Sequence, residues 1–230
     1  ILLAVVLFAA LSYAVTGSQN GGSKNASEEK MRTDAAAILN YAQGVRTAVG
    51  RMRLSNGCTD EQISFDYNNS STTCLTSETP LSGYENVNSP TDCRCHVFHP
   101  LGGGIPWVAP GQMPHAKYGG VYANLYGGTS GIKELGTDNS DLYLINTVSY
   151  PTGVPTDNAR QFCKIYNEVA GNANADINTL MWGLNGSKFN GSNYNVNGVV
   201  AVPQIKGKAA ACYRYMDDNN YTFYFVLLER

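Results

Sequence analysis

The chain lacks any cluster of basic residues and has neither an acidic nor a basic tail. Only 15% of its 230 residues are charged, 16 Lys and Arg against 18 Asp and Glu, for a net charge of -2. A protein that binds the phosphate backbone of a nucleic acid needs a concentrated positive face. The composition therefore gives no support for nucleic-acid binding, and the length fits one ordinary domain with an appendage or at most two small domains.

Motifs that mark common enzyme classes are missing as well. The glycines at 102–104 lead into Ile105 and Pro106, not into the Lys-Ser/Thr pair or helix start of a phosphate-binding loop. No Gly-x-Ser-x-Gly nucleophile turn occurs. The acidic stretches 138–141 and 217–220 lack the glycine and distal glutamate of an EF-hand, so we interpret them as turns, with calcium binding as the alternative. The sequence predicts no catalytic residue and no cofactor.

Histidines are also scarce, and two of the three lie beside cysteines. Residues 93–99 read CRCHVFH, which brings Cys93, Cys95, His96 and His99 together. Zinc sites usually draw paired ligands from separate elements, and neighbours such as Cys95 and His96 point to opposite sides of a strand. A c-type haem needs two residues between its cysteines, and this stretch has one. We expect no metal here, and we keep a secreted hydrolase that uses His96 or His99 as an alternative function.

Cysteines are few but even in number. The six cysteines are dispersed through the polar part of a chain rich in Gly and Tyr, at positions 58, 74, 93, 95, 163 and 212. This usage is typical of loop-rich extracellular domains in which cysteines form disulfides. The alternative is six reduced thiols in a cytosolic protein. Composition and spacing do not decide which cysteines pair with one another.

The chain begins with an apolar segment, residues 1–15, that carries no charge. As a helix it would extend about 22 Å, less than the roughly 30 Å hydrocarbon core of a bilayer. Neither an initiator Met nor a basic segment precedes Ile1, so we interpret the start as a processed amino terminus or as a sequence trimmed by a few residues. We expect this segment to be buried against copies of itself.

An amphipathic helix is expected over residues 25–57, after a glycine-rich joint. The joint contains Gly17, Gly21 and Gly22, and a glycine inside a helix costs about 1 kcal/mol relative to alanine, so the helix should break there. Beyond the joint, apolar residues recur every three or four positions and predict one buried stripe. The stripe consists of Met31, Ala35, Ile38, Ala42, Val45, Val49 and Met52.

The remainder, residues 58–230, is expected to form a globular α+β head with an antiparallel sheet. Alternation of apolar residues predicts short strands. The predicted strands cover residues 62–67, 142–148, 198–205, 209–216 and 221–228, the last two forming a hairpin. A helix is expected over residues 157–170, with Gly171 as its stop. Residues 100–131 are rich in Gly and Pro and predict loops with brief strands.

The plan of the whole chain resembles that of type IV pilins and pilin-like proteins. The resemblance rests on the apolar segment, the glycine-rich joint, the amphipathic helix up to about Met52 and a cysteine-bearing head. It implies a lollipop fold, in which a long N-terminal helix packs on a small antiparallel sheet head stapled by disulfides. The sequence departs from the family in one respect. Pilins usually carry a glutamate near the start of the mature chain, and here no acidic residue precedes Glu28.

The resemblance also implies a structural function. The chain would be a subunit of an extracellular filament, a homopolymer that waits in the inner membrane and is built by pilus assembly machinery. Residues 1–24 would supply the filament core and its joint. The core residues would be Leu2, Leu3, Val5, Val6, Leu7, Phe8, Leu11 and Val15. Alternatives are a minor pilin or pseudopilin of a secretion system, and a membrane-anchored periplasmic binding domain.

The same resemblance bears on the disulfides. Cys163 and Cys212 match by position the carboxy-terminal disulfide loop of the family. For the other four cysteines we expect Cys74 to pair with Cys93 and Cys58 with Cys95.

Overall fold

A computed structural model of the chain describes residues 2–66, 74, 83–118, 120–127, 131–132, 134–136, 141–149, 157–173, 175, 177, 180–181, 188–192, 199–200, 206–215 and 220–230. Of residues 2–26, 110, 120–127, 131, 148–149, 180–181, 199–200 and 215 it describes the backbone alone. The fold is α+β, with two helices on one face of a small, mainly antiparallel sheet and three disulfides.

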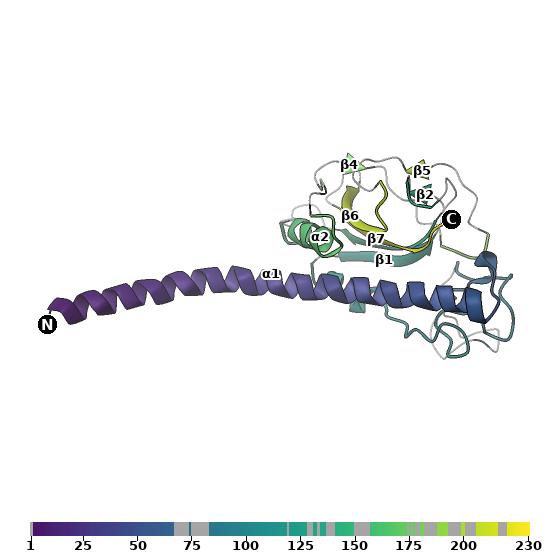
Figure 1. The fold of residues 1–230 in the computed structure, drawn as a ribbon, viewed down its shortest axis with the longest axis horizontal. Coiled ribbons are helices and arrows are strands. Elements are labelled where there is room, and N and C mark those ends of the chain that lie inside the picture. Colours follow the sequence, from purple (N-terminus) through teal and green to yellow (C-terminus); the bar gives the residue numbers. More distant parts are fainter. Residues whose placement is uncertain are drawn as a thin grey trace.

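The first helix, α1 (Leu2–Ser55), is the longest element. In Figure 1 its second half lies along the head, and its first half continues beyond the head towards the N-terminus. The backbone of α1 runs without interruption through Gly17, Gly21 and Gly22, so the predicted break is wrong for this structure. A glycine weakens a helix through backbone entropy, but it keeps the N–H and C=O that the helix needs.

The apolar stripe predicted on α1 is confirmed. All seven of its residues, from Met31 to Met52, are at most 5% exposed. The helix ends close to the predicted position, because the N–H groups of Asn56 and Cys58 both donate to Met52 O (3.1 and 3.2 Å) and Gly57 adopts a φ of 68°. This left-handed residue after the last turn is the usual way to satisfy the final carbonyls.

Gly50 offers a test of the packing of α1. A Cβ built on this residue meets no atom within 4 Å, so alanine fits the helix without a clash. We expect Gly50→Ala to raise the free energy of unfolding by up to about 1 kcal/mol, because alanine has the higher helix propensity. Gly57→Ala is the matched control, and its positive φ predicts a loss of stability. Urea denaturation of the two variants measures both changes, and a destabilising Gly50→Ala would contradict the open environment of this residue.

The main sheet contains five strands in the order β1-β3-β7-β6-β4. They are β1 (Gly120–Gly127), β3 (Leu142–Ser149), β7 (Asn220–Leu228), β6 (Ala210–Tyr215) and β4 (Leu180–Met181). All neighbours are antiparallel except β4 and β6. A separate parallel pair is formed by β2 (Gly131–Ile132) and β5 (Val199–Val200). The strand at 142–148 and the terminal hairpin are thus confirmed, whereas β1 is longer than the brief strands expected in its region.

The strand predicted at 62–67 does not form. A short 3-10 helix, η1 (Asp60–Gln62), precedes a single bridge between Ser64 and His96. Ile63, Ser64 and Phe65 are all fully buried, so the apolar and polar positions do not face opposite environments. Among the described residues, the backbone of Ser64 pairs with that of Cys95 and Val97, through two hydrogen bonds of 2.9 Å.

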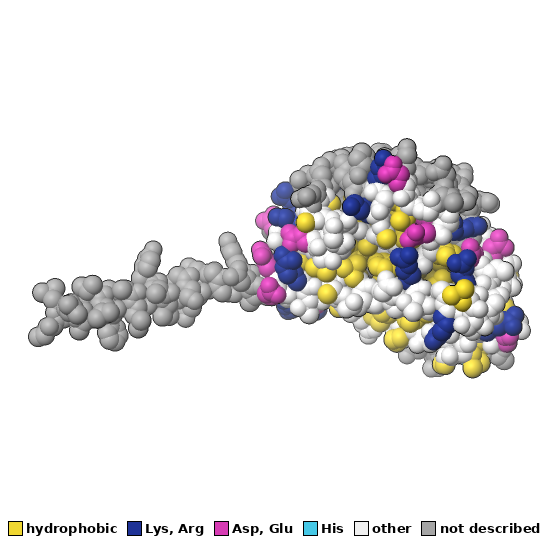
Figure 2. Space-filling model, viewed as in Figure 1, with side chains coloured by type: hydrophobic (Ala, Val, Ile, Leu, Met, Phe, Trp, Pro, Cys, Tyr) yellow, Lys and Arg dark blue, Asp and Glu magenta, His cyan; other side chains and the backbone are white. Residues whose placement is uncertain are grey.

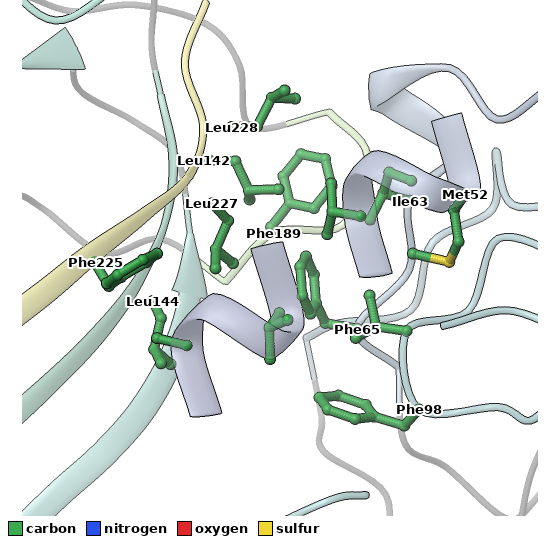
Figure 3. Close-up of a cluster of buried hydrophobic side chains, with 14 of the residues drawn as sticks. Met52, Ile63, Phe65, Phe98, Leu142, Leu144, Phe189, Phe225, Leu227 and Leu228 are labelled. Atoms are coloured by element: carbon green, nitrogen blue, oxygen red, sulfur yellow. The ribbon is translucent and has the colours of Figure 1, made fainter. Parts of the chain in front are cut away.

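The second helix, α2 (Asp157–Val169), matches the prediction and packs beside α1 on the sheet. Its buried face, which includes Phe162, Cys163 and Tyr166, contacts the β7 residue Phe223. A larger cluster lies between α1, the sheet and the loops that follow α1. Figure 3 shows Met52 of α1, Phe65 and Phe98 of the loops, and Leu144 and Phe225 of the sheet in this cluster. Two further 3-10 helices, η2 (Pro110–Gln112) and η3 (Pro114–Tyr118), precede β1.

Candidate functional site

The outer face of α1 is the candidate assembly surface of the described region. Opposite the buried stripe, it consists of Thr33, Ala37, Asn40, Gln43 and Thr47, all exposed and uncharged. The two threonine hydroxyls donate to carbonyls four residues earlier, at 3.0 and 2.9 Å, so their polar groups are satisfied within the helix. A surface helix usually carries charges on this side. The outer face of α1 therefore carries no charge to desolvate between positions 33 and 50, although the exposed amides of Asn40 and Gln43 would need partners in a helix contact.

The two charged residues of α1 between positions 33 and 50 are engaged with the head. Asp34 is 8% exposed and accepts hydrogen bonds from Lys117 Nζ (3.1 Å) and Tyr118 Oη (2.7 Å). Burial and the nearby Asp34 carboxylate raise the pKa of Tyr118. Arg46 pairs with Glu229 at 2.9 Å. Both charges thus fix α1 to the head and leave its outer face neutral between positions 33 and 50, whereas exposed Glu29 and Arg51 flank that stretch.

The predicted filament-core residues, from Leu2 to Val15, have side chains outside the described residues. The backbone places them on α1, in one helix with the stripe that packs on the head. Among helices with described side chains, we find none that combines the length and apolar character needed to cross a bilayer.

The six cysteines form the three expected pairs. Cys58 bonds to Cys95, Cys74 to Cys93 and Cys163 to Cys212, with Cα–Cα distances of 5.9, 5.0 and 5.4 Å. The first bond ties the end of α1 to the following loops, and the last ties α2 to β6. Because Cys93 and Cys95 are both oxidised, neither can supply the thiolate that a zinc site at residues 93–99 would need.

The histidines of the loop region lie in unlike environments. His96 is 7% exposed, and its Nδ1 has no hydrogen-bond partner in the described part of the chain. Burial, together with nearby His99, lowers the pKa of His96 to about 4, against the opposing effect of Asp92. His99 accepts a hydrogen bond from the Leu101 N–H at Nδ1 (3.2 Å). Ser64, which pairs with His96 in a backbone bridge, is fully buried, and its hydroxyl accepts a hydrogen bond from Asp66 N (3.2 Å).

The acidic turns considered for calcium lie mostly outside the described residues. Asp141 is described and fully buried, and it accepts backbone hydrogen bonds from Ile132 (2.9 Å) and Arg230 (3.1 Å). Burial raises its pKa to about 6, although both hydrogen bonds act against that rise. Its oxygens thus serve to join β2 to the end of β7. Across the residues with described side chains, no group of three or more His, Cys, Asp or Glu is placed to hold a metal.

The glycine turn at residues 102–104 fixes the far end of α1. Arg51 Nη2 donates to Gly102 O (3.0 Å) and Gly103 O (2.7 Å), and Gly103 N donates to His96 O (2.8 Å). A Cβ on Gly103 would meet Val97 O at 2.2 Å. The sequence predicts loops in this region, but the close contact of the glycines with α1 and with residues 96–97 leaves no signal in a single sequence.

A groove opens between α1 and α2 where α1 leaves the head. It encloses about 800 Å³ and is lined by residues that include Met31, Ile177, Glu28, Asp157 and Arg160. Figure 2 shows acidic and basic side chains close together at this end of the head. The lining carries both signs of charge over an apolar floor and has no donor set typical of a cofactor.

No protein-family model, curated protein or solved structure matches this chain.

Proposed function

We propose that this protein is a structural subunit of an extracellular type IV pilus-like filament, without catalytic activity. The observation that carries the proposal is the division of α1 into two unlike halves. One half buries a continuous stripe on the head, and the other continues from it as a helix through the glycine-rich joint to the apolar segment. A helix with apolar residues all round requires a membrane or other apolar partners.

Assembly would remove the apolar segment from water. Burial of Leu2, Leu3, Val5, Val6, Leu7, Phe8 and Leu11 at about 1.5 to 3 kcal/mol each gives more than about 10 kcal/mol per subunit before entropy costs. Identical copies related by a head-to-tail repeat that does not close form a fibre. The apolar segment thus supplies both the driving force and the contact that repeats.

The described half of α1 supports the same arrangement. Between positions 33 and 50 its outer face is uncharged, and its threonine hydroxyls are satisfied within the helix. Small residues such as Ala37 and Thr33 permit helices to approach closely. Before assembly the apolar segment would hold the subunit at the inner membrane, and the pilus machinery and identical subunits would be its partners. The three disulfides support a location outside the reducing cytosol.

Replacing Phe8 with Asp tests the proposal, and Phe8→Leu is the matched control. We expect Phe8→Asp to abolish filaments in sheared surface fractions, because a carboxylate in an apolar helix bundle costs several kcal/mol. Phe8→Leu should leave filaments intact. Negative-stain electron microscopy and mass spectrometry of the sheared fraction provide the measurement, and non-reducing peptide mapping checks that the variant head keeps its disulfides.

Two outcomes would contradict the filament. The wild-type chain could remain in the inner membrane with no copies in the sheared fraction, which would favour the membrane-anchored binding domain. Filaments that persist in the Phe8→Asp variant would show that the apolar segment does not form the contact between subunits. A minor pilin or pseudopilin would appear in the sheared fraction as a trace component beside a more abundant subunit.

A further inference from the structure

The 3-10 helix η3 is attached to the head by side chains. Two backbone hydrogen bonds lie around η3 in the described part of the chain. Ala116 N donates to Met113 O (3.0 Å), and Gln112 N donates to Ala109 O (2.9 Å). Both bonds are local, and none within the described part of the chain joins η3 to α1, α2 or the sheet. Release of η3 therefore requires the loss of side-chain contacts, without disruption of a backbone ladder.

Three side chains make the attachment. His115 is fully buried, and its ring centre lies 6.2 Å from that of Phe223 on β7. Tyr118 stacks on Phe162 of α2, with the ring centres 4.3 Å apart. Lys117 and Tyr118 both bond to Asp34 of α1. These contacts make η3 a bridge between two helices and the sheet.

His115 contributes two unsatisfied polar atoms to this bridge. Neither Nδ1 nor Nε2 has a hydrogen-bond partner among the described residues. Asn146, which lies opposite Phe223 in the β3–β7 register, also has an unpaired buried atom, Oδ1. A buried polar group without a partner costs roughly 1 to 3 kcal/mol, and a buried charge costs more. The site therefore accommodates a neutral imidazole and opposes an imidazolium with two N–H donors.

In the described part of the chain, burial shifts the pKa of His115 and no carboxylate offsets that shift. The exposed carboxylate of Asp157 and the guanidinium of Arg160, both on α2, act on Tyr221. Asp34 on α1 is engaged with Lys117 and Tyr118, and Lys117 would repel an imidazolium. α2 and β7 contribute the neutral phenols of Tyr166 and Tyr221. β3 contributes the amide of Asn146, and the side chains of β1 lie outside the described residues. Burial lowers the pKa of His115 to about 4 and is the cause that accounts for the shift.

We propose that η3 is an acid-released latch, in which protonation of His115 detaches η3 from α1, α2 and the sheet while the disulfide-stapled sheet stays folded. In the open state the imidazole reaches water and can hold a second proton at little cost. In the closed state the imidazole is buried, and a positive charge on it is costly. Opening uncovers the rings of Phe162 and Phe223, and it breaks the tie between η3 and Asp34. The latch is a property of a single subunit and does not depend on filament formation.

The size of the effect follows from proton linkage. The open state has the ordinary histidine pKa of 6.5, and the closed state has a pKa of about 4. Below pH 6.5 the open state binds more protons, so acid favours opening until about pH 4, where the closed state also titrates. Between pH 7.5 and pH 5 the ratio of open to closed subunits should rise about 30-fold.

Amide hydrogen exchange of the purified full chain at pH 7.5 and pH 5 tests the latch. After correction for the intrinsic pH dependence of exchange, we expect the amides of residues 113 and 115–118 to exchange about 30-fold faster at pH 5. Amides of β6 and β7 should change by less than about 3-fold. His115→Gln should remove the acceleration, and His99→Gln, which changes a histidine outside η3, should retain it.

Several results would overturn the latch. If the faster exchange persists in His115→Gln, the acid-sensitive group is not His115. If the amides of β7 exchange faster to the same degree, acid unfolds the whole head. No acceleration at pH 5 would show that η3 stays closed. If His115→Gln fails to fold, an NMR titration of the His115 ring in the wild-type protein decides, because a pKa near 6.5 in the closed state would be incompatible with the latch.

Discussion

Gly103→Ala is expected to lower the free energy of unfolding by more than about 4 kcal/mol, the range reached when a mutation forces buried backbone to move. The added Cβ would lie 2.2 Å from Val97 O and 2.8 Å from Val97 C and Cα. These are backbone atoms in a segment held by Cys95 and by the hydrogen bond from Val97 N to Ser64 O (2.9 Å). Relief of the clash would move the turn away from Arg51 and break the contacts at the end of α1.

Gly111→Ala is the control for this experiment. A Cβ on Gly111 meets no atom within 4 Å, so we expect a change of less than about 0.5 kcal/mol at this exposed position. Chemical denaturation of both variants, followed by far-UV circular dichroism, gives the two free energies. Equal stability of Gly103→Ala and Gly111→Ala would mean that the turn at 102–104 adapts without cost.

Removal of the Cys163–Cys212 disulfide is the second large perturbation. The double change Cys163→Ala with Cys212→Ala should lower stability by about 4 kcal/mol, because the bond spans 49 residues and restricts the unfolded chain. The folded structure around it is well satisfied, since Asn167 Nδ2 donates to Cys212 O (2.9 Å) and Cys212 N donates to Asn167 Oδ1 (2.7 Å). These hydrogen bonds should preserve the fold of the variant at low denaturant.

The Cys74–Cys93 disulfide provides the comparison. It spans 19 residues, and the same relation predicts a loss of about 3 kcal/mol when both of its cysteines become alanine. Urea denaturation of the two double variants ranks the two disulfides by their contribution to the free energy of unfolding. A larger loss for the Cys74 pair than for the Cys163 pair would contradict an effect dominated by the unfolded chain.

Local periodicity accounts for the elements that the sequence predicted well. The stripe on α1, the helix α2 and the β6–β7 hairpin each repeat their apolar residues with the period of the element, so neighbouring residues are enough to define them. The strand β1 is different. Its sequence, GVYANLYG, has glycines at both ends, and it is a strand because it pairs with β3, from the Gly127–Tyr143 pair to the Gly120–Ser149 pair.

Other features depend on contacts that a single sequence does not display. Ser64 lies in an alternating segment, yet it is buried with Ile63 and Phe65 because its backbone pairs with a disulfide-held loop. The unpaired nitrogens of His115 result from the packing of η3 against Phe223, in a region that the sequence predicted only as a loop. The candidate site shows the same limit. Composition predicts the apolar segment, whereas the neutral outer face of α1 emerges only once Asp34 and Arg46 are seen to bond to the head.

The placement of the Cys58–Cys95 bond has a mechanical consequence. It lies just beyond the last turn of α1, next to the turn that Arg51 holds, so the far end of the helix is fastened covalently to the head. A tensile force applied between the apolar segment and the head would load the buried stripe of α1 in shear. Separation of α1 from the head would have to begin at the opposite end of the stripe, near Met31. It would stop at the Cys58–Cys95 bond. Under tension the contacts of the stripe would bear the load together, and the head would stay attached through Cys58–Cys95 even if they failed.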